Sequence, residues 1–192
     1  MDAEHDEKTT GSRFLEEKLF QRRTILISGG ITDQTARSVT ERLLALSAES
    51  ADPIHVYISS PVGHVESGDV IHDVIKFIRP EVKTIGCGWV ASAGALIFVG
   101  AKKENRLCLP NTRFLLHQPS GGVFGKAVDI EIQAEQIVKM RERLNQIFAE
   151  ATGQPIERIQ KDTNRDFWMT PEEAIEYGLL GSVITSEAAL SR

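Results

Sequence analysis

Short apolar runs alternate along the chain with segments in which apolar residues recur at helical spacing. The runs are rich in β-branched residues, and several of them stop at glycine, serine or proline, which is typical of strands. Strands are predicted at residues 24–27, 54–58, 82–87, 106–109 and 113–116. Because helical segments lie between successive strands, this order predicts an α/β fold with mostly parallel strands and helices covering the sheet.

The helices are indicated by their apolar stripes. The first stripe consists of Ala36, Val39, Leu43 and Leu46. A second stripe predicts a helix over residues 66–78, which Pro80 ends, and a short helix of small residues is expected to begin near Ala91. Near the end of the chain, Thr170 and Glu173 have the spacing of a capping box, which predicts a further helix start.

One predicted helix is much longer than the others and covers about residues 127–151. Its apolar face is formed by Ile130, Ala134, Ile137, Leu144, Phe148 and Ala151. Gly153 and Pro155 end it. About 25 residues correspond to roughly 37 Å, which is longer than a domain of this size requires. The apolar face must be covered, and the pattern leaves two alternatives, namely packing along its own domain or contact with a partner subunit.

Composition narrows the class of protein. A chain of 192 residues with 41 % hydrophobic and 26 % charged residues is typical of one globular domain. The net charge of −5 argues against a general nucleic-acid binder, and without a run of 18 apolar residues no membrane span is expected. Residues 1–11 are polar and acidic and lack the features of a secretory signal, which predicts a flexible tail and a cytoplasmic protein. Cys87 and Cys108 are expected to be free thiols.

The main candidate for chemistry is a serine among small residues. The sequence lacks the common metal-binding and nucleotide-binding motifs, so no cofactor is expected. Ser92 follows a predicted strand directly and stands at a predicted helix start, between two alanines. Small neighbours allow a sharp turn and the close approach of a substrate carbonyl, and unpaired helix N–H groups can bind an oxyanion. A serine at this place is also a common N-cap. The segment is not a GxSxG motif, because Val90 replaces the first glycine.

A nucleophilic serine needs a base, which is usually a histidine. His117 ends the strand at 113–116 and enters a loop rich in proline and glycine, where catalytic groups are often displayed. His64 follows a turn and can line a cleft at the strand ends, whereas His72 is expected to be exposed on its helix. A carboxylate would orient the base. Three candidates follow His117, and their spacing does not choose among them: Asp129, Asp162 and Asp166.

Three segments, in this order, resemble the signature segments of the ClpP family, the proteolytic subunits of ATP-dependent Clp proteases. They are GWVASAGA at 88–95, LPNTRFLLHQP at 109–119 and DTNRDFWM at 162–169. The resemblance extends over about residues 12–184. It implies that Ser92 is the nucleophile and His117 the general base, and that Asp166, rather than the other two carboxylates, orients the imidazole.

The resemblance also implies the remaining parts of the site and the fold. The backbone N–H groups of Gly63 and Ala93 would form the oxyanion hole, and Gly121 and Gly122 would flank an extended substrate peptide. The fold would be a crotonase-like α/β superhelix of β-β-α units. Residues 12–192 would form one protease domain, with the helix at 127–151 as a projecting handle.

The function that the resemblance implies is that of a serine endopeptidase which cleaves unfolded proteins to peptides inside an oligomeric chamber. The partners would be further copies of the chain in two stacked heptameric rings, an AAA+ unfoldase and unfolded polypeptides. ATP would be used by the unfoldase, and the chain itself would need no cofactor or metal. Neither nucleic acid nor a membrane would be a partner.

The chain departs from the family pattern at four places. Val62 stands where the family usually has glycine, Asn164 stands where an acidic residue usually precedes the arginine, and the chain before Ser12 is short and acidic. His55 and Leu107 replace aromatic residues of the family's surface pocket for unfoldase loops. The Cβ of Val62 is expected to limit positive φ in the turn. These departures leave open that the chain is a regulatory or weakly active subunit of a mixed ring with a second ClpP-like subunit. An acyl-CoA enzyme of the crotonase fold is disfavoured, because those enzymes use no Ser-His-Asp triad.

Overall fold

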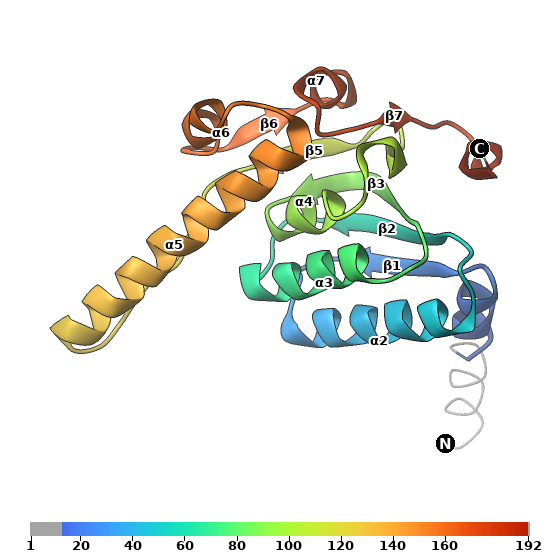
Figure 1. Ribbon diagram of the computed structural model, residues 1–192, viewed down its shortest axis with the longest axis horizontal. Helices are drawn as coiled ribbons and strands as arrows, with labels where there is room; N and C mark the ends of the chain where they lie inside the picture. Colours follow the sequence, from blue (N-terminus) through green and yellow to red (C-terminus); the bar gives the residue numbers. More distant parts are fainter. Residues whose placement is uncertain (1–12, 192) are drawn as a thin grey trace, which may run out of the picture.

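The computed structural model describes residues 13–191 and contains one continuous β-sheet with a helical layer on one face (Figure 1). Its main strand order is β1 (Thr24–Ser28), β2 (Ile54–Ser60), β3 (Val82–Ala91), β4 (Arg106–Cys108) and β7 (Ser182–Val183). These strands are all parallel to their neighbours. The predicted α/β fold and the five predicted strands are therefore confirmed. The expected tail at residues 1–11 lies outside the described residues.

Strand β3 is long, and its two halves pair with different neighbours. Residues 84–86 pair with β4, whereas residues 89–91 pair with β5 (Arg113–Leu116). Gly88 lies between the two halves with a φ of 69°, in the left-handed region that glycine adopts without strain. Strand β5 in turn pairs antiparallel with β6 (Phe167–Met169). The second half of β3 thus leaves the neighbourhood of β4 and carries its C-terminal end to β5 and β6.

Three helices cover the sheet: α2 (Asp33–Glu49), α3 (Val65–Phe77) and α4 (Ala93–Phe98) (Figure 1). The buried residues of α2 are the four that the periodicity predicts, namely Ala36, Val39, Leu43 and Leu46. Helix α3 buries Ile71 and Ile75, whereas Val70 points to solvent. All six residues of α4 are buried, so this short helix is held by packing on every side.

The helices that follow β5 are α5 (Ala127–Thr152), α6 (Ile156–Asp162), α7 (Pro171–Tyr177) and the short 3-10 helix η2 (Glu187–Ser191), whereas another short 3-10 helix, η1 (Lys103–Asn105), directly precedes β4. Residues 13–21 are also helical. The predicted capping box of α7 is present, since Thr170 and Glu173 each accept a hydrogen bond from the other's backbone N–H. No helix of residues 13–191 has the length and apolar character needed to cross a lipid bilayer.

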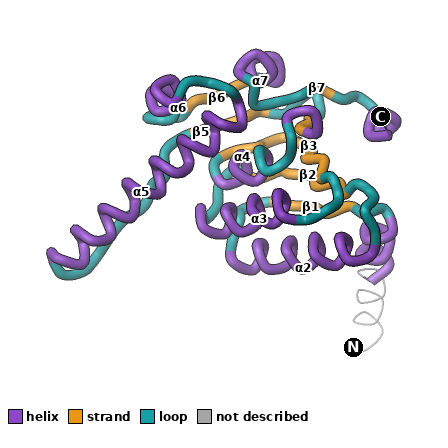
Figure 2. Tube along the Cα trace, in the orientation of Figure 1, coloured by secondary structure: helices purple, strands orange, loops and turns teal. Residues whose placement is uncertain are grey.

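Helix α5 projects away from the sheet, and only its C-terminal part packs on the rest of the chain (Figures 1 and 2). Its buried residues are Leu144, Asn145, Phe148, Ala149 and Thr152. The N-terminal half exposes apolar side chains of Val128, Ile130, Ile132 and Val138. Packing along its own domain therefore accounts for one half of the helix. The apolar side chains of the other half are not covered by residues 13–191.

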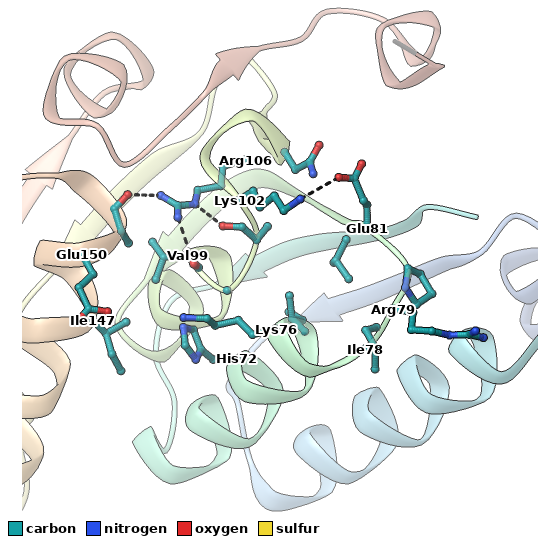
Figure 3. Close-up of a pocket in the computed structure, with 17 residues that line it drawn as sticks. His72, Lys76, Ile78, Arg79, Glu81, Val99, Lys102, Arg106, Ile147 and Glu150 are labelled. Carbon is teal, nitrogen blue, oxygen red and sulfur yellow. Dashed lines mark hydrogen bonds and ion pairs between the residues drawn. The ribbon is translucent and has the colours of Figure 1, made fainter. Parts of the chain in front are cut away.

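A cavity of about 400 Å³ lies between α3, the loop after α4 and the end of α5, and neither Ser92 nor His117 lines it (Figure 3). Arg106 is 5 % exposed at its edge and donates hydrogen bonds to the carbonyls of Val99, Ala101 and Ala151 at 3.4, 2.8 and 2.7 Å. Burial lowers the pKa of this guanidinium to about 10. The Arg106 guanidinium thus bridges the C-terminal ends of α4 and α5, whose carbonyls carry partial negative charge.

His72 also lines this cavity and is only 3 % exposed, so the expectation that it is exposed was wrong (Figure 3). Its Nδ1 lies 2.9 Å from Oδ1 of Asp73. The apolar stripe of α3 is therefore extended by a histidine, whose ring is buried while one nitrogen keeps a carboxylate partner.

Replacing Arg106 by methionine is expected to lower the free energy of unfolding by about 3 kcal/mol, because buried carbonyls at two helix ends lose their donor. The measurement is chemical denaturation of the assembled protein. The matched control is Arg37→Met, which removes an exposed arginine paired with Glu41 at 2.9 Å and should cost less than about 0.5 kcal/mol. Equal losses for the two variants would contradict this role of Arg106.

Candidate active site

The strand registers bring three distant segments to one place. Strands β3 and β5 pair in parallel up to Ala91 and Leu115, and β5 pairs antiparallel with β6 up to Leu116 and Phe167. One further step in the same registers sets Ser92 beside Leu116, and it sets His117 opposite Asp166. The positions of the three predicted triad residues thus follow from the pairing of three strands.

Ser92 occupies a strained turn between β3 and α4. Its φ and ψ are 56° and −122°, a conformation that residues with a Cβ adopt rarely and at a cost of about 1–3 kcal/mol. Its backbone N–H donates to the carbonyl of Leu115 at 3.1 Å, and its carbonyl accepts from the first turn of α4. The side chain makes no capping hydrogen bond. Ser92 is therefore not an ordinary N-cap, although the sequence allowed that interpretation.

Small residues make room for this turn. A Cβ added at Gly94 would lie 3.1 Å from Cβ of Ser60, and a Cβ added at Gly68 would lie 3.2 Å from Cβ of Ala93. The beginning of α4 therefore packs closely on the end of β2 and on α3. The run of alanine and glycine around Ser92 is explained by this close packing of backbone segments.

His117 and Asp166 face each other as the register indicates. His117 Nδ1 lies 3.6 Å from Asp166 Oδ1, which is an ion-pair distance rather than a short hydrogen bond. The histidine side chain is 23 % exposed and the aspartate side chain 65 % exposed. Gln118 fixes the two segments to each other, because its N–H donates to Thr163 O at 2.7 Å and its side chain donates to Asn164 O at 2.9 Å. The Nε2 of His117 is left for another partner.

The other two carboxylates that the sequence left open have different surroundings. Asp162 accepts a hydrogen bond from the Tyr177 hydroxyl at 2.9 Å and lies 3.5 Å from Nε of Arg158. Burial, together with this carboxylate, raises the pKa of Tyr177. Asp129 is exposed in the first turn of α5. Of the three, Asp166 is the one that the structure places beside His117.

Ser92 and His117 line one small cavity. Its other walls are mostly apolar and come from α3, α4, β5 and α5: Val65, Ala93, Leu96, Leu116, Pro119, Leu144 and Phe148. A serine hydroxyl and an imidazole thus share a recess with little polar competition. The cavity has a volume of only about 20 Å³, so it is a shallow, mostly apolar recess beside the two side chains.

The turn that contains Gly63 is attached to Ile31 by a parallel bridge. Ile31 donates to Val62 O at 3.1 Å and accepts from the His64 N–H at 2.9 Å, so the N–H of Gly63 itself points away from Ile31. Within residues 13–191 no backbone carbonyl accepts from it. A Cβ at Gly63 would lie 2.5 Å from Cβ of Ile31 and 3.1 Å from Cβ of Ala93. Gly63 is therefore next to Ala93, the first residue of α4, whose N–H has no acceptor within its helix.

Val62 does not strain this turn. In the described chain the residues other than glycine with positive φ are Arg23 and Ser92. Val62 keeps negative φ, and its side chain is 58 % exposed. The Cβ of Val62 was expected to limit a positive φ in the turn, but the turn does not require a positive φ at this position.

The remaining predicted site residues are exposed. Gly121 and Gly122 belong to a stretch without helix or strand before α5, and a Cβ added at Gly121 would meet no atom within 4 Å. Neither packs against Ser92 in this chain, so their role beside a substrate stays a prediction. Cys87 is half-buried and Cys108 buried, and both are free. Among residues 13–191 no group of three or more His, Cys, Asp or Glu side chains is arranged to hold a metal ion.

A serine on a strained turn, a histidine paired with an aspartate and two neighbouring N–H groups are the parts of a nucleophilic hydrolase site. Comparison with known proteins gives the family. The sequence model of the Clp protease family matches residues 8–187. The ATP-dependent Clp protease proteolytic subunit of Paracoccus denitrificans is 67 % identical over 165 residues, which cover 86 % of this chain and 83 % of the relative.

Longer matches agree. The ATP-dependent Clp protease proteolytic subunit 3 of Rhizobium etli is 58 % identical over 97 % of this chain and 98 % of the relative. The structure of ClpP1 from Listeria monocytogenes superposes with a TM-score of 0.83 at 50 % identity, covering 92 % of this chain and 99 % of that one. The chain belongs to the Clp protease family and has its crotonase-like α/β fold.

Proposed function

We propose that this protease is a serine endopeptidase in which Ser92 is the nucleophile, His117 the general base and Asp166 the orienting carboxylate. The observation that carries the proposal is the strand register. It brings together a strained serine after β3, a histidine after β5 and an aspartate before β6, all at one edge of the sheet. No such coincidence is needed for the stability of the fold. The strain at Ser92 costs stability and is typical of functional sites.

The first chemical step forms a bond between Oγ of Ser92 and the carbonyl carbon of the scissile peptide. The Oγ proton passes to Nε2 of His117, and Asp166 stabilises the resulting imidazolium through Nδ1. The carbonyl π electrons move to the oxygen, where the N–H groups of Gly63 and Ala93 bind the negative charge. His117 then gives its proton to the leaving amine as the C–N bond breaks. Water hydrolyses the acyl-enzyme by the same steps.

The proposed substrates are unfolded polypeptides. An extended chain can pair its backbone with the exposed segment at Gly121 and Gly122 on one side and with the segment after Pro61 on the other. Such main-chain pairing tolerates many sequences. An apolar side chain next to the scissile bond would pack against the apolar walls of the shallow recess beside Ser92.

The proposed assembly is two stacked heptameric rings of this chain, served by an AAA+ unfoldase in the cytoplasm. The support for self-assembly is the projecting half of α5, whose apolar side chains lie uncovered together with Phe124, which is 97 % exposed. Enclosure in a chamber would keep an active serine away from folded proteins. ATP would be used by the unfoldase, and the chemistry of the triad needs no metal or cofactor.

The homo-oligomer alone tests this proposal against a regulatory role. The purified assembled chain should hydrolyse a fluorogenic peptide with an apolar residue before the scissile bond. Hydrolysis that occurs only after a second ClpP-like subunit is added would contradict the proposal and favour a regulatory subunit of a mixed ring.

Replacing Gly63 by alanine is expected to lower kcat by about 100-fold or more. The new Cβ would lie 2.5 Å from Cβ of Ile31, so the turn must move and its N–H must turn away from the oxyanion. Hydrolysis of the fluorogenic peptide measures the effect. Gly30→Ala is the matched control, because its Cβ would meet only Val62 O at 3.8 Å, an ordinary contact distance, and it should keep kcat within about threefold. An active Gly63→Ala variant would contradict the assignment of this donor.

A further inference from the structure

A chain of polar side chains lies directly beside the Gly63 turn and is not part of the triad. Nδ1 of His64 is 3.0 Å from Oγ of Ser67, and Ser67 Oγ donates to Oδ1 of Asp33 at 2.6 Å. Nε2 of His64 is 3.0 Å from Oε2 of Glu66. His64 precedes the first residue of α3, Ser67 lies in its first turn, and Asp33 is the first residue of α2. The side chains therefore connect the beginnings of two helices.

Asp33, Ser67 and His64 form a polar relay, and its hydrogen bonds determine which atom donates in each contact. Because the Ser67 hydroxyl gives its proton to Asp33, the Nδ1 of His64 must be the donor to Ser67. The donated hydrogen bond from Ser67 also lowers the pKa of Asp33, which keeps the acceptor charged.

The backbone around His64 connects the relay to Gly63. The His64 N–H donates to Ile31 O at 2.9 Å, and the His64 carbonyl accepts from the Gly68 N–H at 3.1 Å. Ser67 is 2 % exposed and therefore has little freedom to move. The turn is thus held on one side by the bridge to Ile31 and on the other by the side chain of His64. Gly63, the residue between these attachments, bears the N–H that faces away from Ile31.

We propose that His64 is a positioning residue, which, through Ser67 and Asp33, holds the N–H of Gly63 in the direction that binds the oxyanion. The inference rests on the proposed serine-peptidase function. His64 touches neither substrate nor Ser92 in this scheme and acts through the peptide unit that joins it to Gly63. Loss of the His64 side chain should weaken the binding of the transition state more than the binding of the substrate, because an oxyanion exists only in the transition state and intermediate.

The first test compares His64→Ala with His64→Asn in the assembled protein. Asparagine can place an amide N–H near the position of Nδ1, so it should keep the contact with Ser67 and retain kcat within about threefold. Alanine should lower kcat about tenfold with little change in KM, and Ser67→Ala should do the same. Because the residues act as a unit, the double variant should lose no more than either single variant.

A pair of inhibitors separates positioning from a general structural effect. Ser92 Oγ adds to the carbonyl carbon of a peptide aldehyde while the Oγ proton passes to His117. The former aldehyde oxygen then occupies the oxyanion site. The corresponding peptide alcohol cannot form this bond. The inhibition constant of the aldehyde should rise about tenfold in His64→Ala, whereas that of the alcohol should stay within about twofold. The proposal would be overturned if His64→Ala had the same kcat as the native chain. It would also be overturned if the inhibition constants of the aldehyde and the alcohol changed by the same factor in His64→Ala.

Amide hydrogen exchange tests the clamp without using activity. Exchange at the turn of residues 62–64 should be about tenfold faster in His64→Ala than in the native chain, and close to native in His64→Asn. Unchanged exchange in His64→Ala would overturn the proposal even in an active enzyme. If exchange is faster in His64→Ala but the native chain hydrolyses no peptide, the clamp is supported and the proposed peptidase mechanism is refuted, so the two failures are distinguishable.

Discussion

Replacing Ser92 by alanine is expected to abolish peptide hydrolysis while the fold persists. Loss of a catalytic serine costs on the order of 10⁶-fold in kcat in serine proteases. Ser92 Oγ makes no capping hydrogen bond, so its removal leaves no helix end unsatisfied. Alanine must adopt the same positive φ, and the free energy of unfolding should stay within about 0.5 kcal/mol of the native value. Hydrolysis of a fluorogenic peptide and denaturation of the assembled protein measure the two effects.

Ser92→Gly is the matched variant. Glycine also lacks the nucleophile and should be equally inactive, but it adopts a φ of 56° without strain. Its free energy of unfolding should therefore be equal to or higher than that of Ser92→Ala, by up to about 1 kcal/mol. Substantial activity in either variant would refute Ser92 as the nucleophile. A glycine variant that is clearly less stable than the alanine variant would refute the strained turn.

Replacing Asp166 by asparagine is expected to lower kcat on the order of 10³-fold with a smaller effect on KM. The amide cannot stabilise the imidazolium of His117, and it can favour the wrong tautomer by donating to Nδ1. The reduction in kcat should be less than for a fully buried aspartate, because the Asp166 side chain is 65 % exposed and water can provide part of the stabilisation of the imidazolium. The measurement is the separate determination of kcat and KM with a fluorogenic peptide.

Asp162→Asn and Asp129→Asn are the controls, and both should keep kcat within about threefold. Asparagine at 162 can still accept the hydrogen bond from Tyr177, and Asp129 is exposed at the far end of α5. If Asp162→Asn proved to be the inactive variant, the pairing of His117 with Asp166 would not be the catalytic one.

Local patterns predicted those parts of the fold that depend on local physics. The period of 3.6 gave the four buried residues of α2, and the capping box gave the start of α7, since both are set by neighbouring residues of one helix. His72 was wrongly expected at the surface, because the burial of one face of α3 also depends on α5 and on the loop after α4.

The site could be predicted only in part, because it is assembled by strand pairing. Spacing alone could not select Asp166, whose place opposite His117 arises from the antiparallel register of β5 and β6. The positive φ of Ser92 has no sequence signal of its own beyond the small residues around it. The polar relay of Asp33, Ser67 and His64 joins two helix starts, and only the fold brings them together.

Helix α5 shows the same limit. Its extent was predicted correctly, but the pattern could not say what covers its apolar stripe, because periodicity records amphipathic character and not the identity of the partner. The structure assigns the C-terminal half to the chain's own core and leaves Val128, Ile130 and Val138 exposed. Contact with further copies of the chain is the proposed cover for this half.

Covalent labelling of the assembled protein tests the central claim most directly. A fluorophosphonate reacts with a serine only where a base activates its hydroxyl and donors stabilise the charge on the phosphoryl oxygen. Mass spectrometry of the labelled chain should locate one adduct, on Ser92, and the labelling should disappear in His117→Ala. An adduct on another residue, or none on Ser92 in assembled protein that hydrolyses peptide, would contradict the account.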